Sequence, residues 1–261
     1  MLLLERGLVV SREKARTLIM SGNVYVENQK SDKPGTVYKD DVLIEVKAPK
    51  VAYVSRGGLK LEKAIKVFDI DLSGKIVMDI GASTGGFTDC MLQNGAEKVY
   101  AVDVGYGQLD WKLRNDPRVI NLERTNIRYI DEKLVPDKLN FFSVDVSFIS
   151  LRLVLPVARK FMADGATAVC LIKPQFEAGR ENVGKNGVVR DKNVHETVVR
   201  EICELLMQAG FNILGLDFSP IKGPKGNIEY LIYIEKSDFG ENLCGIDVAS
   251  LVQKSHEELS L

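Results

Sequence analysis

The sequence predicts a doubly wound α/β fold with a Rossmann-like sheet, preceded by a small α+β module. Three observations support this class. Short apolar runs alternate with helical stretches over most of the chain, one run passes directly into a glycine-rich turn, and the first fifty residues follow a different pattern. A chain of 261 residues is long enough for one large domain and one small domain.

The large domain is expected to begin with a helix over 57–68, after which strands and helices alternate. The predicted strands lie at 76–80, 98–103, 118–122, 140–145 and 167–172, with two more near 212–218 and 228–234 closing the sheet. A last helix is expected over 246–258. Parallel strands joined by helices give a sheet that is covered on both faces.

The small module has its own elements. Ser11 can cap a helix over Arg12 to Met20, and short strands are expected at 23–27 and 42–46, joined by a turn-rich segment. Pro49 blocks any continuation into the next helix. We therefore expect a module at 1–47, a linker at 48–54 and a second domain at 55–261.

Composition excludes several classes of protein. Hydrophobic residues make up 45% and charged residues 27% of the chain, and its net charge is −1, so it is neither disordered nor strongly basic. No apolar run reaches the roughly 20 residues of a membrane span. The first residues have an acid where a signal peptide has its basic region, so we expect a cytoplasmic protein.

Metal chemistry is not expected. The cysteines are Cys90, Cys170, Cys203 and Cys244, which form no CxxC pair and are interpreted as reduced core thiols. His195 and His256 fall in polar helical stretches with no partner cluster in the sequence. We predict no metal site.

The glycine-rich turn after the strand at 76–80 predicts a pocket for a nucleotide-like cofactor, because glycines allow close approach and the next helix offers free amides. The candidate cofactor-binding residues here are Asp79, Gly81, Ala82, Ser83, Gly85, Gly86 and Phe87. A dinucleotide fingerprint that begins at Gly81 needs glycine two residues later, where Ser83 stands. Asp103, at the end of the next strand, can hold ribose hydroxyls. S-adenosylmethionine is therefore favoured over a dinucleotide.

Charged residues end two further strands. Asp145 follows the apolar run 141–144, and Lys173 follows the run 169–172, so both are expected at the edge of the sheet where ligands bind. Lys60 and Glu229 give no such signal when each is taken alone. Lys60 could be a solvated side chain, and Glu229 could lie on the polar face of an alternating strand.

Basic residues are concentrated in two places. Arg6, Arg12, Lys14 and Arg16 lie in the small module, which has nine Lys and Arg against seven Asp and Glu over residues 1–50. The loop from Gln175 to Asp191 carries Arg180, Lys185 and Arg190 beside three glycines, which suits a flexible flap that contacts RNA phosphates. A solvated helix face and an ordinary mobile loop are the structural alternatives.

The run from Glu5 to Arg16, followed by Ile19 to Val26, resembles the S4 RNA-binding domain of ribosomal proteins across residues 2–46. That family places these basic residues on structured RNA through phosphate contacts and shape. The family pattern begins a few residues earlier with Arg-Leu-Asp, so we expect this chain to start inside the first helix, with weaker RNA binding or stability.

Motifs along the whole chain resemble the TlyA-type proteins, known both as hemolysins and as ribosomal RNA methyltransferases, whose second domain is FtsJ-like. These motifs are 55–61, 79–87, 145–151, 173–180, 183–191 and 226–231. The resemblance implies a methyltransferase sheet, S-adenosylmethionine as cofactor, and methylation of a ribose 2′-hydroxyl in ribosomal RNA of the small or large subunit. Ribosomal RNA or ribosomal subunits would be the partners.

The same resemblance implies a catalytic tetrad of Lys60, Asp145, Lys173 and Glu229, with Asp145 also near the cofactor. A ribose hydroxyl needs a base, and a free lysine with a pKa of about 10.4 is mostly protonated near neutrality. A second lysine nearby disfavours two protonated amines, so Lys173 is expected to act as the base. The alternatives are a membrane-lytic hemolysin and, less favoured, a nicotinamide oxidoreductase.

Overall fold

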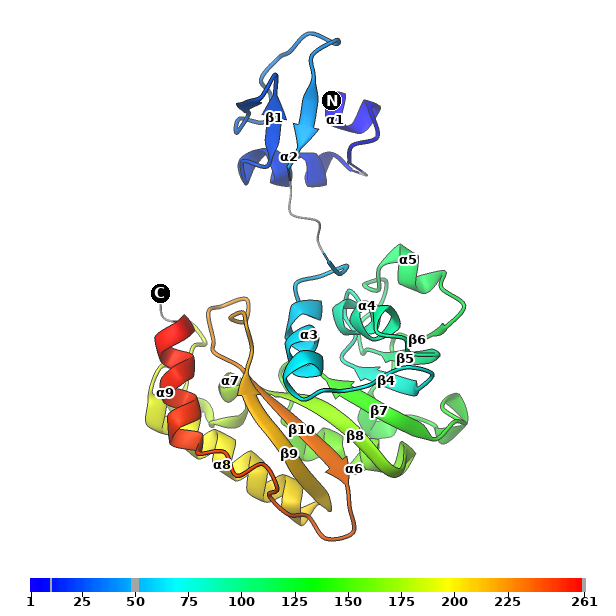
Figure 1. Cartoon of the computed structure of the whole chain (residues 1–261), viewed down its shortest axis with the longest axis vertical. Helices are drawn as coiled ribbons and strands as arrows, with labels where there is room; N and C mark the ends of the chain where they lie inside the picture. Colours follow the sequence, from blue (N-terminus) through cyan, green and yellow to red (C-terminus); the bar gives the residue numbers. More distant parts are fainter. Residues whose placement is uncertain (10, 48–51, 260–261) are drawn as a thin grey trace. The chain divides into compact units, whose positions relative to one another are not determined.

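The computed structural model describes residues 1–9, 11–47 and 52–259, and the side chain of Lys14 lies outside that description. The chain divides into two compact units, Met1–Val51 and Ala52–Leu261 (Figure 1). Of the expected linker at 48–54, residues 48–51 lie outside the described residues.

The small unit is a three-stranded sheet with two helices. Its elements are α1 (Leu2–Glu5), α2 (Arg12–Met20), β1 (Val24–Val26), β2 (Gln29–Lys30) and β3 (Ile44–Val46). The strand order is β2-β1-β3 and both pairings are antiparallel. Leu3, Val9 and Val24 form its buried core. The strand β2 was not predicted, since both of its residues are exposed and lie in the turn-rich segment.

The large unit contains the remaining elements. The helices are α3 (Gly58–Val67), α4 (Gly86–Gln93), α5 (Trp111–Arg114), α6 (Leu151–Phe161), α7 (Pro174–Glu177), α8 (Lys192–Gln208) and α9 (Val248–Leu259), with 3-10 turns η1 (Ile127–Tyr129), η2 (Glu132–Leu134) and η3 (Arg180–Asn182). The strands are β4 (Ile76–Ile80), β5 (Lys98–Val102), β6 (Val119–Leu122), β7 (Leu139–Val144), β8 (Met162–Ile172), β9 (Phe211–Phe218) and β10 (Tyr230–Lys236).

These strands form one sheet in the order β6-β5-β4-β7-β8-β10-β9, which confirms the predicted α/β class. The pairings from β6 to β8 are parallel, and β10 is antiparallel to both β8 and β9. The strand β8 begins five residues earlier than the predicted 167, and β10 begins at Tyr230 rather than 228. Glu229 therefore precedes its strand, whereas Lys173 follows β8 at the same edge.

Successive residues of the central strands pack on opposite faces of the sheet. Val77 belongs to the core cluster that includes Leu61 of α3 and Met91 of α4, while Met78 belongs to the cluster that includes residues of α6, α8 and α9. Figure 1 shows the corresponding layers, with α3 and α4 on one side of the sheet and α6 and α8 on the other. Because helices cover both faces of the sheet, a ligand is expected to bind at the carboxyl edge of the parallel strands.

The structure corrects the interpretation of one histidine. His195 is fully buried, its Nδ1 lies 2.7 Å from the Tyr230 hydroxyl and its ring centroid lies 4.9 Å from that of His256. The helical pattern around His195 is polar, but the ring faces the sheet. Among the cysteines, Cys90, Cys170 and Cys203 are buried and Cys244 is half-buried.

Candidate active site

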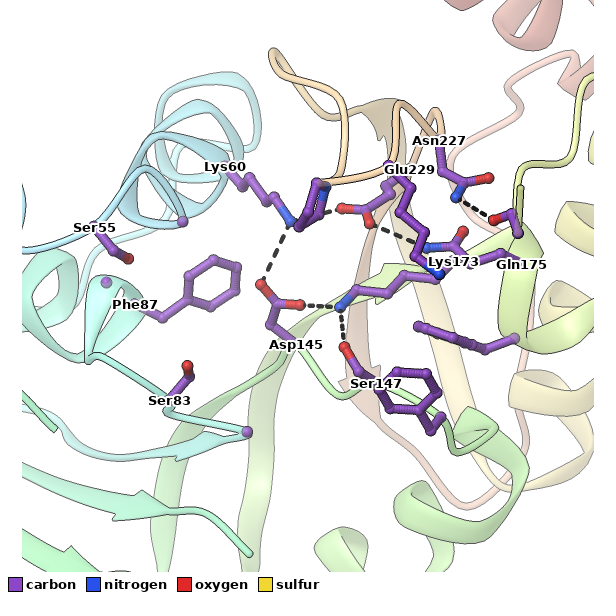
Figure 2. Close-up of a pocket in the computed structure, with 18 of the residues that line it drawn as sticks. Ser55, Lys60, Ser83, Phe87, Asp145, Ser147, Lys173, Gln175, Asn227 and Glu229 are labelled. Atoms are coloured by element: carbon purple, nitrogen blue, oxygen red, sulfur yellow. Dashed lines mark hydrogen bonds and ion pairs between the residues drawn. The ribbon is translucent and has the colours of Figure 1, made fainter. Parts of the chain in front are cut away.

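A cavity of about 810 Å³ lies at the carboxyl edge of β4, β7 and β8, and its lining residues come from five segments of the large unit, 55–60, 81–87, 145–148, 173–187 and 224–229 (Figure 2). The sequence-predicted residues that line it are Lys60, Gly81, Ala82, Ser83, Gly86, Phe87, Asp145, Lys173, Arg180 and Glu229. Asp79, Gly85, Asp103, Lys185 and Arg190 do not line this cavity, although each lies in a segment next to it.

The glycine turn is shaped by contacts within the protein as well as by the cavity. Gly81 has a φ of +88°, and a Cβ there would lie 2.6 Å from the carbonyl oxygen of Asp145. At Gly86, which opens α4, a Cβ would lie 2.2 Å from the Ser55 Oγ. Both positions therefore require glycine because another segment of the chain passes against the backbone.

Asp79 lies beneath this turn and is fully buried. Its Oδ2 accepts hydrogen bonds from the Thr88 amide at 2.8 Å and the Thr88 hydroxyl at 2.7 Å, and its Oδ1 lies 3.3 Å from the Ser143 Oγ. Burial raises the pKa of Asp79 to about 7, against the lowering effect of Thr88. Asp79 thus holds the start of α4 in place, and its predicted contact with the cofactor stays a prediction.

Asp103 follows β5 and bridges the turn to the next loop. Its Oδ2 accepts from the Ser83 amide at 2.8 Å and its Oδ1 from the Gly105 amide at 2.6 Å. A carboxylate has about four acceptor positions, so each oxygen can still accept a further hydrogen bond. Asp103 is half-buried beside the turn, and a contact with a cofactor ribose stays a prediction.

Four charged side chains meet on the other side of the cavity. Lys60, in the first turn of α3, places its Nζ 2.6 Å from the Glu229 Oε2 and 3.5 Å from the Asp145 Oδ2. Lys173 Nζ forms an ion pair with the Asp145 Oδ1 and donates to the Ser147 Oγ at 3.3 Å. Figure 2 shows Asp145 between the two lysines. The structure thus brings together all four residues of the expected tetrad.

Three of these four side chains are almost completely buried, so their ion pairs determine which charged forms are stable. Lys60 is 6%, Lys173 is 7% and Glu229 is 1% exposed. Burial lowers the pKa of Lys60, but Asp145 and Glu229 outweigh this effect and raise the pKa above its usual value. Lys60 is therefore a fixed cation at neutral pH.

Sequence reasoning assigned no role to several residues at the cavity. Gln175 donates from its Nε2 to the Glu229 Oε1 at 3.3 Å, while its own Oε1 is buried without a hydrogen-bond partner among the described residues. Ser147 contacts Lys173, and Phe148 is 88% exposed on a positive φ of 64°. Gln175 and Ser147 each lie two residues beyond a predicted site residue, which is the signal that could have found them.

The candidate RNA-binding residues are distributed over both units. Arg180, Lys185 and Arg190 are exposed in the loop after α7, and Arg180 lines the cavity. In the small unit, Arg12 and Arg16 are exposed on α2. The Arg6 guanidinium is exposed but donates to the carbonyl oxygens of Val42 and Asp40. Lys14 lies in α2, and its side chain is outside the described residues.

Over residues 1–9, 11–47 and 52–259, no group of three or more His, Cys, Asp or Glu side chains is arranged to hold a metal ion. Within the same ranges, no helix has the length and apolar character needed to cross a membrane.

Comparison with known proteins places both units in families. Residues 53–236 match the model of the FtsJ-like methyltransferases, and residues 1–44 match that of the S4 domain. A Bacillus subtilis protein, YqxC, provisionally named an rRNA methyltransferase, is 49% identical over 99% of this chain and 93% of its own length. The 16S/23S rRNA (cytidine-2′-O)-methyltransferase TlyA of Mycobacterium tuberculosis is 42% identical over 89% of this chain and 87% of its own.

Solved structures agree with this placement. A Streptococcus thermophilus protein provisionally titled a hemolysin superimposes with a TM-score of 0.81 at 47% identity, covering 99% of this chain and 95% of its own. A Listeria monocytogenes protein provisionally titled an S-adenosylmethionine-dependent methyltransferase has the same sheet, with a TM-score of 0.52 at 19% identity over 70% of this chain and 98% of its own. The second likeness concerns the fold only.

Proposed function

Because this chain belongs to the FtsJ-like methyltransferase family and carries an S4 domain, we propose that it methylates a ribose 2′-hydroxyl of ribosomal RNA. Methyl transfer from S-adenosylmethionine is the reaction of the family, and the ribose acceptor is the specific element of the proposal. The observation that carries it is the contact of two buried lysines with one carboxylate, Asp145, beside the glycine turn.

Lys173 takes the proton from the acceptor hydroxyl in this mechanism. A hydroxyl is a weak nucleophile until it loses its proton, so a base in contact with the acceptor is required. Lys60 is held as a cation, so a neutral Lys173 leaves the four side chains with one excess negative charge. Transfer of the proton to the Lys173 Nζ gives two ammonium groups and two carboxylates, and the new ammonium is held by Asp145 and Ser147.

The other residues of the cavity orient the reactants. When bound, S-adenosylmethionine supplies an electrophilic methyl carbon on a sulfonium, so the protein's main task is alignment. Gly81, Ala82, Ser83 and Phe87 form the wall on which it would lie, and Asp103 is suited to its ribose hydroxyls. An extruded nucleotide would enter the same cavity, of about 810 Å³, on the tetrad side.

The S4 domain supports RNA as the carrier of that nucleotide. Arg12 and Arg16 on α2, with Arg6 and Lys14, would contact RNA phosphates, and Arg180, Lys185 and Arg190 would do so beside the cavity. The name of the Mycobacterium tuberculosis relative includes both 16S and 23S rRNA, so either ribosomal subunit is a candidate substrate. Such a substrate would place the reaction in the cytoplasm.

Transfer of labelled methyl groups to purified small subunits, large subunits and protein-free ribosomal RNA tests this function. The RNA is taken from cells that lack the gene, so that acceptor sites are unmodified. We expect label in ribosomal RNA from at least one of these substrates. Absence of label in all of them, with the cofactor bound, would overturn the proposal, and a liposome leakage assay on the same protein tests the membrane-lytic alternative.

A further inference from the structure

The loop from Gly179 to Asp191 forms one wall of the cavity, through Gly179, Arg180, Val183 and Gly187. Its glycines and basic residues predict a flexible flap. Its second half is instead tied to the rest of the large unit by polar side chains that are almost completely buried. Asn227 is 2% and His195 is 0% exposed.

Asn227 connects the loop to the segment that carries Glu229. Its Oδ1 accepts from the Val189 amide at 3.0 Å, and its Nδ2 donates to the Gly187 carbonyl at 2.9 Å. Its own carbonyl accepts from the Gly223 amide at 2.9 Å. One side chain therefore fixes two points of the loop, Gly187 and Val189, from a position two residues before Glu229.

His195 contacts the same stretch of the loop, at the carbonyl of Val189. Its Nε2 lies 3.1 Å from the Val189 carbonyl, and its Nδ1 lies 2.7 Å from the Tyr230 hydroxyl. A carbonyl only accepts, so Nε2 carries the hydrogen and Nδ1 accepts from Tyr230. Burial lowers the pKa of His195 to about 4, so the ring stays neutral and keeps both bonds at physiological pH.

Tyr230 links this network to the tetrad through the backbone. It begins β10 directly after Glu229, and its hydroxyl also lies 3.1 Å from the Ser255 Oγ of α9. Val189 is thus bound at its amide by Asn227 and at its carbonyl by His195. Asn227 lies two residues before Glu229, and His195 contacts Tyr230, the residue after Glu229. The hydrogen bonds that hold Val189 therefore connect it to the backbone on both sides of Glu229.

We propose that Asn227 and His195 are positioning residues that hold the Gly184–Val189 stretch against the tetrad and so set the shape of the acceptor side of the cavity. This inference rests on the proposed function, because the acceptor is the ribose of an RNA. The cofactor wall is built from the glycine turn after β4 and from Phe87, and among the described residues the side chains of Asn227 and His195 form no hydrogen bond with either. The two substrates should therefore respond differently to loss of the network.

The test compares Asn227→Ala and His195→Phe with the wild-type enzyme in methyl transfer to ribosomal RNA. We expect Asn227→Ala to lower kcat/KM for RNA about tenfold or more, mainly by raising KM, because small displacements at a reacting centre are costly. His195→Phe should have a smaller effect in the same direction. The dissociation constant for S-adenosylmethionine, measured by calorimetry, should change less than about twofold.

Hydrogen exchange separates positioning from a general loss of stability. In Asn227→Ala the Val189 amide should exchange faster, while amides of β4 and β7 keep their wild-type protection. His256→Phe is the matched control, since His256 packs on the same ring but its buried Nε2 has no hydrogen-bond partner among the described residues. That control should behave as wild type.

An active wild type together with an Asn227→Ala enzyme of unchanged KM and unchanged Val189 exchange would overturn this inference while leaving the proposed function intact. Equal losses of cofactor and RNA affinity would overturn it as well, because they indicate a general structural defect. A wild-type enzyme without any transfer to RNA would overturn the proposed function and this inference with it.

Discussion

The strands β4 and β7 lie side by side and each supplies an aspartate to the same edge of the sheet, yet the two carboxylates have opposite electrostatic surroundings. Asp79 is fully buried and its partners are the uncharged groups of Thr88 and Ser143, which leaves its pKa raised to about 7. Asp145 lies between the amino groups of Lys60 and Lys173. A carboxylate without a cation can support a turn, whereas one between two amines can take part in moving a proton.

The largest expected effect comes from Lys173, the proposed base. Lys173→Ala should lower methyl transfer by about 10³-fold or more, since general-base catalysis contributes factors of about 10² to 10⁴. Lys173→Arg is the informative companion, because arginine keeps the charge beside Asp145 but cannot be deprotonated in a protein. Single-turnover assays with saturating cofactor measure both variants, and substantial turnover in either would contradict a role for Lys173 as the base.

The second effect concerns Asp145 directly. Asp145→Asn removes the charge that the two lysines share, so we expect about a 10²-fold loss of transfer and a decrease in the free energy of unfolding of about 3 kcal/mol. The same substitution at Asp79 is the matched control, since Asn can still accept from Thr88 there and donate to Ser143. Urea unfolding and transfer rates check the pair, and equal effects at the two positions would abolish the distinction between them.

The third effect is a pH dependence at Asp79. A carboxyl group whose pKa is raised in the folded state holds its proton longer than in the unfolded chain, so its contribution to stability falls as pH rises from about 4 to about 7. Asp79→Asn removes this dependence. Between pH 5 and pH 8 the variant should gain about 3 kcal/mol in unfolding free energy relative to wild type. Parallel curves for the two proteins would show that Asp79 does not titrate in this range.

The smallest effect is expected at Asp103. Asp103→Ala removes an acceptor from the Ser83 and Gly105 amides and from the predicted ribose contact, so cofactor affinity should fall about tenfold. Calorimetry with S-adenosylmethionine measures the change. An unchanged dissociation constant would show that Asp103 only shapes the turn.

The sequence predicted the strands well because their apolar runs are bounded by glycines and charged residues. It predicted the positions of Asp145 and Lys173 for a general reason, since the carboxyl ends of parallel strands meet at one edge. It missed β2, whose two residues are exposed, and the first half of β8, where Asp164 and Gly165 interrupt the apolar pattern. Both segments are strands because they pair with another strand, and the hydrophobic pattern of a short segment carries no information about such pairing.

Side-chain partners from distant segments account for the other differences. The sequence predicted that Gly81 is a glycine because a ligand approaches it. In the structure a Cβ at Gly81 would collide with the backbone carbonyl of Asp145. His195 looked polar and unpartnered because Val189 and Tyr230 reach it only in the folded chain. The sequence did not indicate that Asp79 supports the start of α4, because its buried hydrogen bonds with Thr88 form only in the folded chain.

The most direct test of the central claim is the chemical position of the transferred methyl group. Ribosomal RNA labelled by the wild-type enzyme is digested to nucleosides and separated by liquid chromatography with mass spectrometry. The tetrad of Lys60, Asp145, Lys173 and Glu229 predicts label in 2′-O-methylated nucleosides and its absence with Lys173→Ala. Label on a nucleobase instead of the ribose would contradict the account.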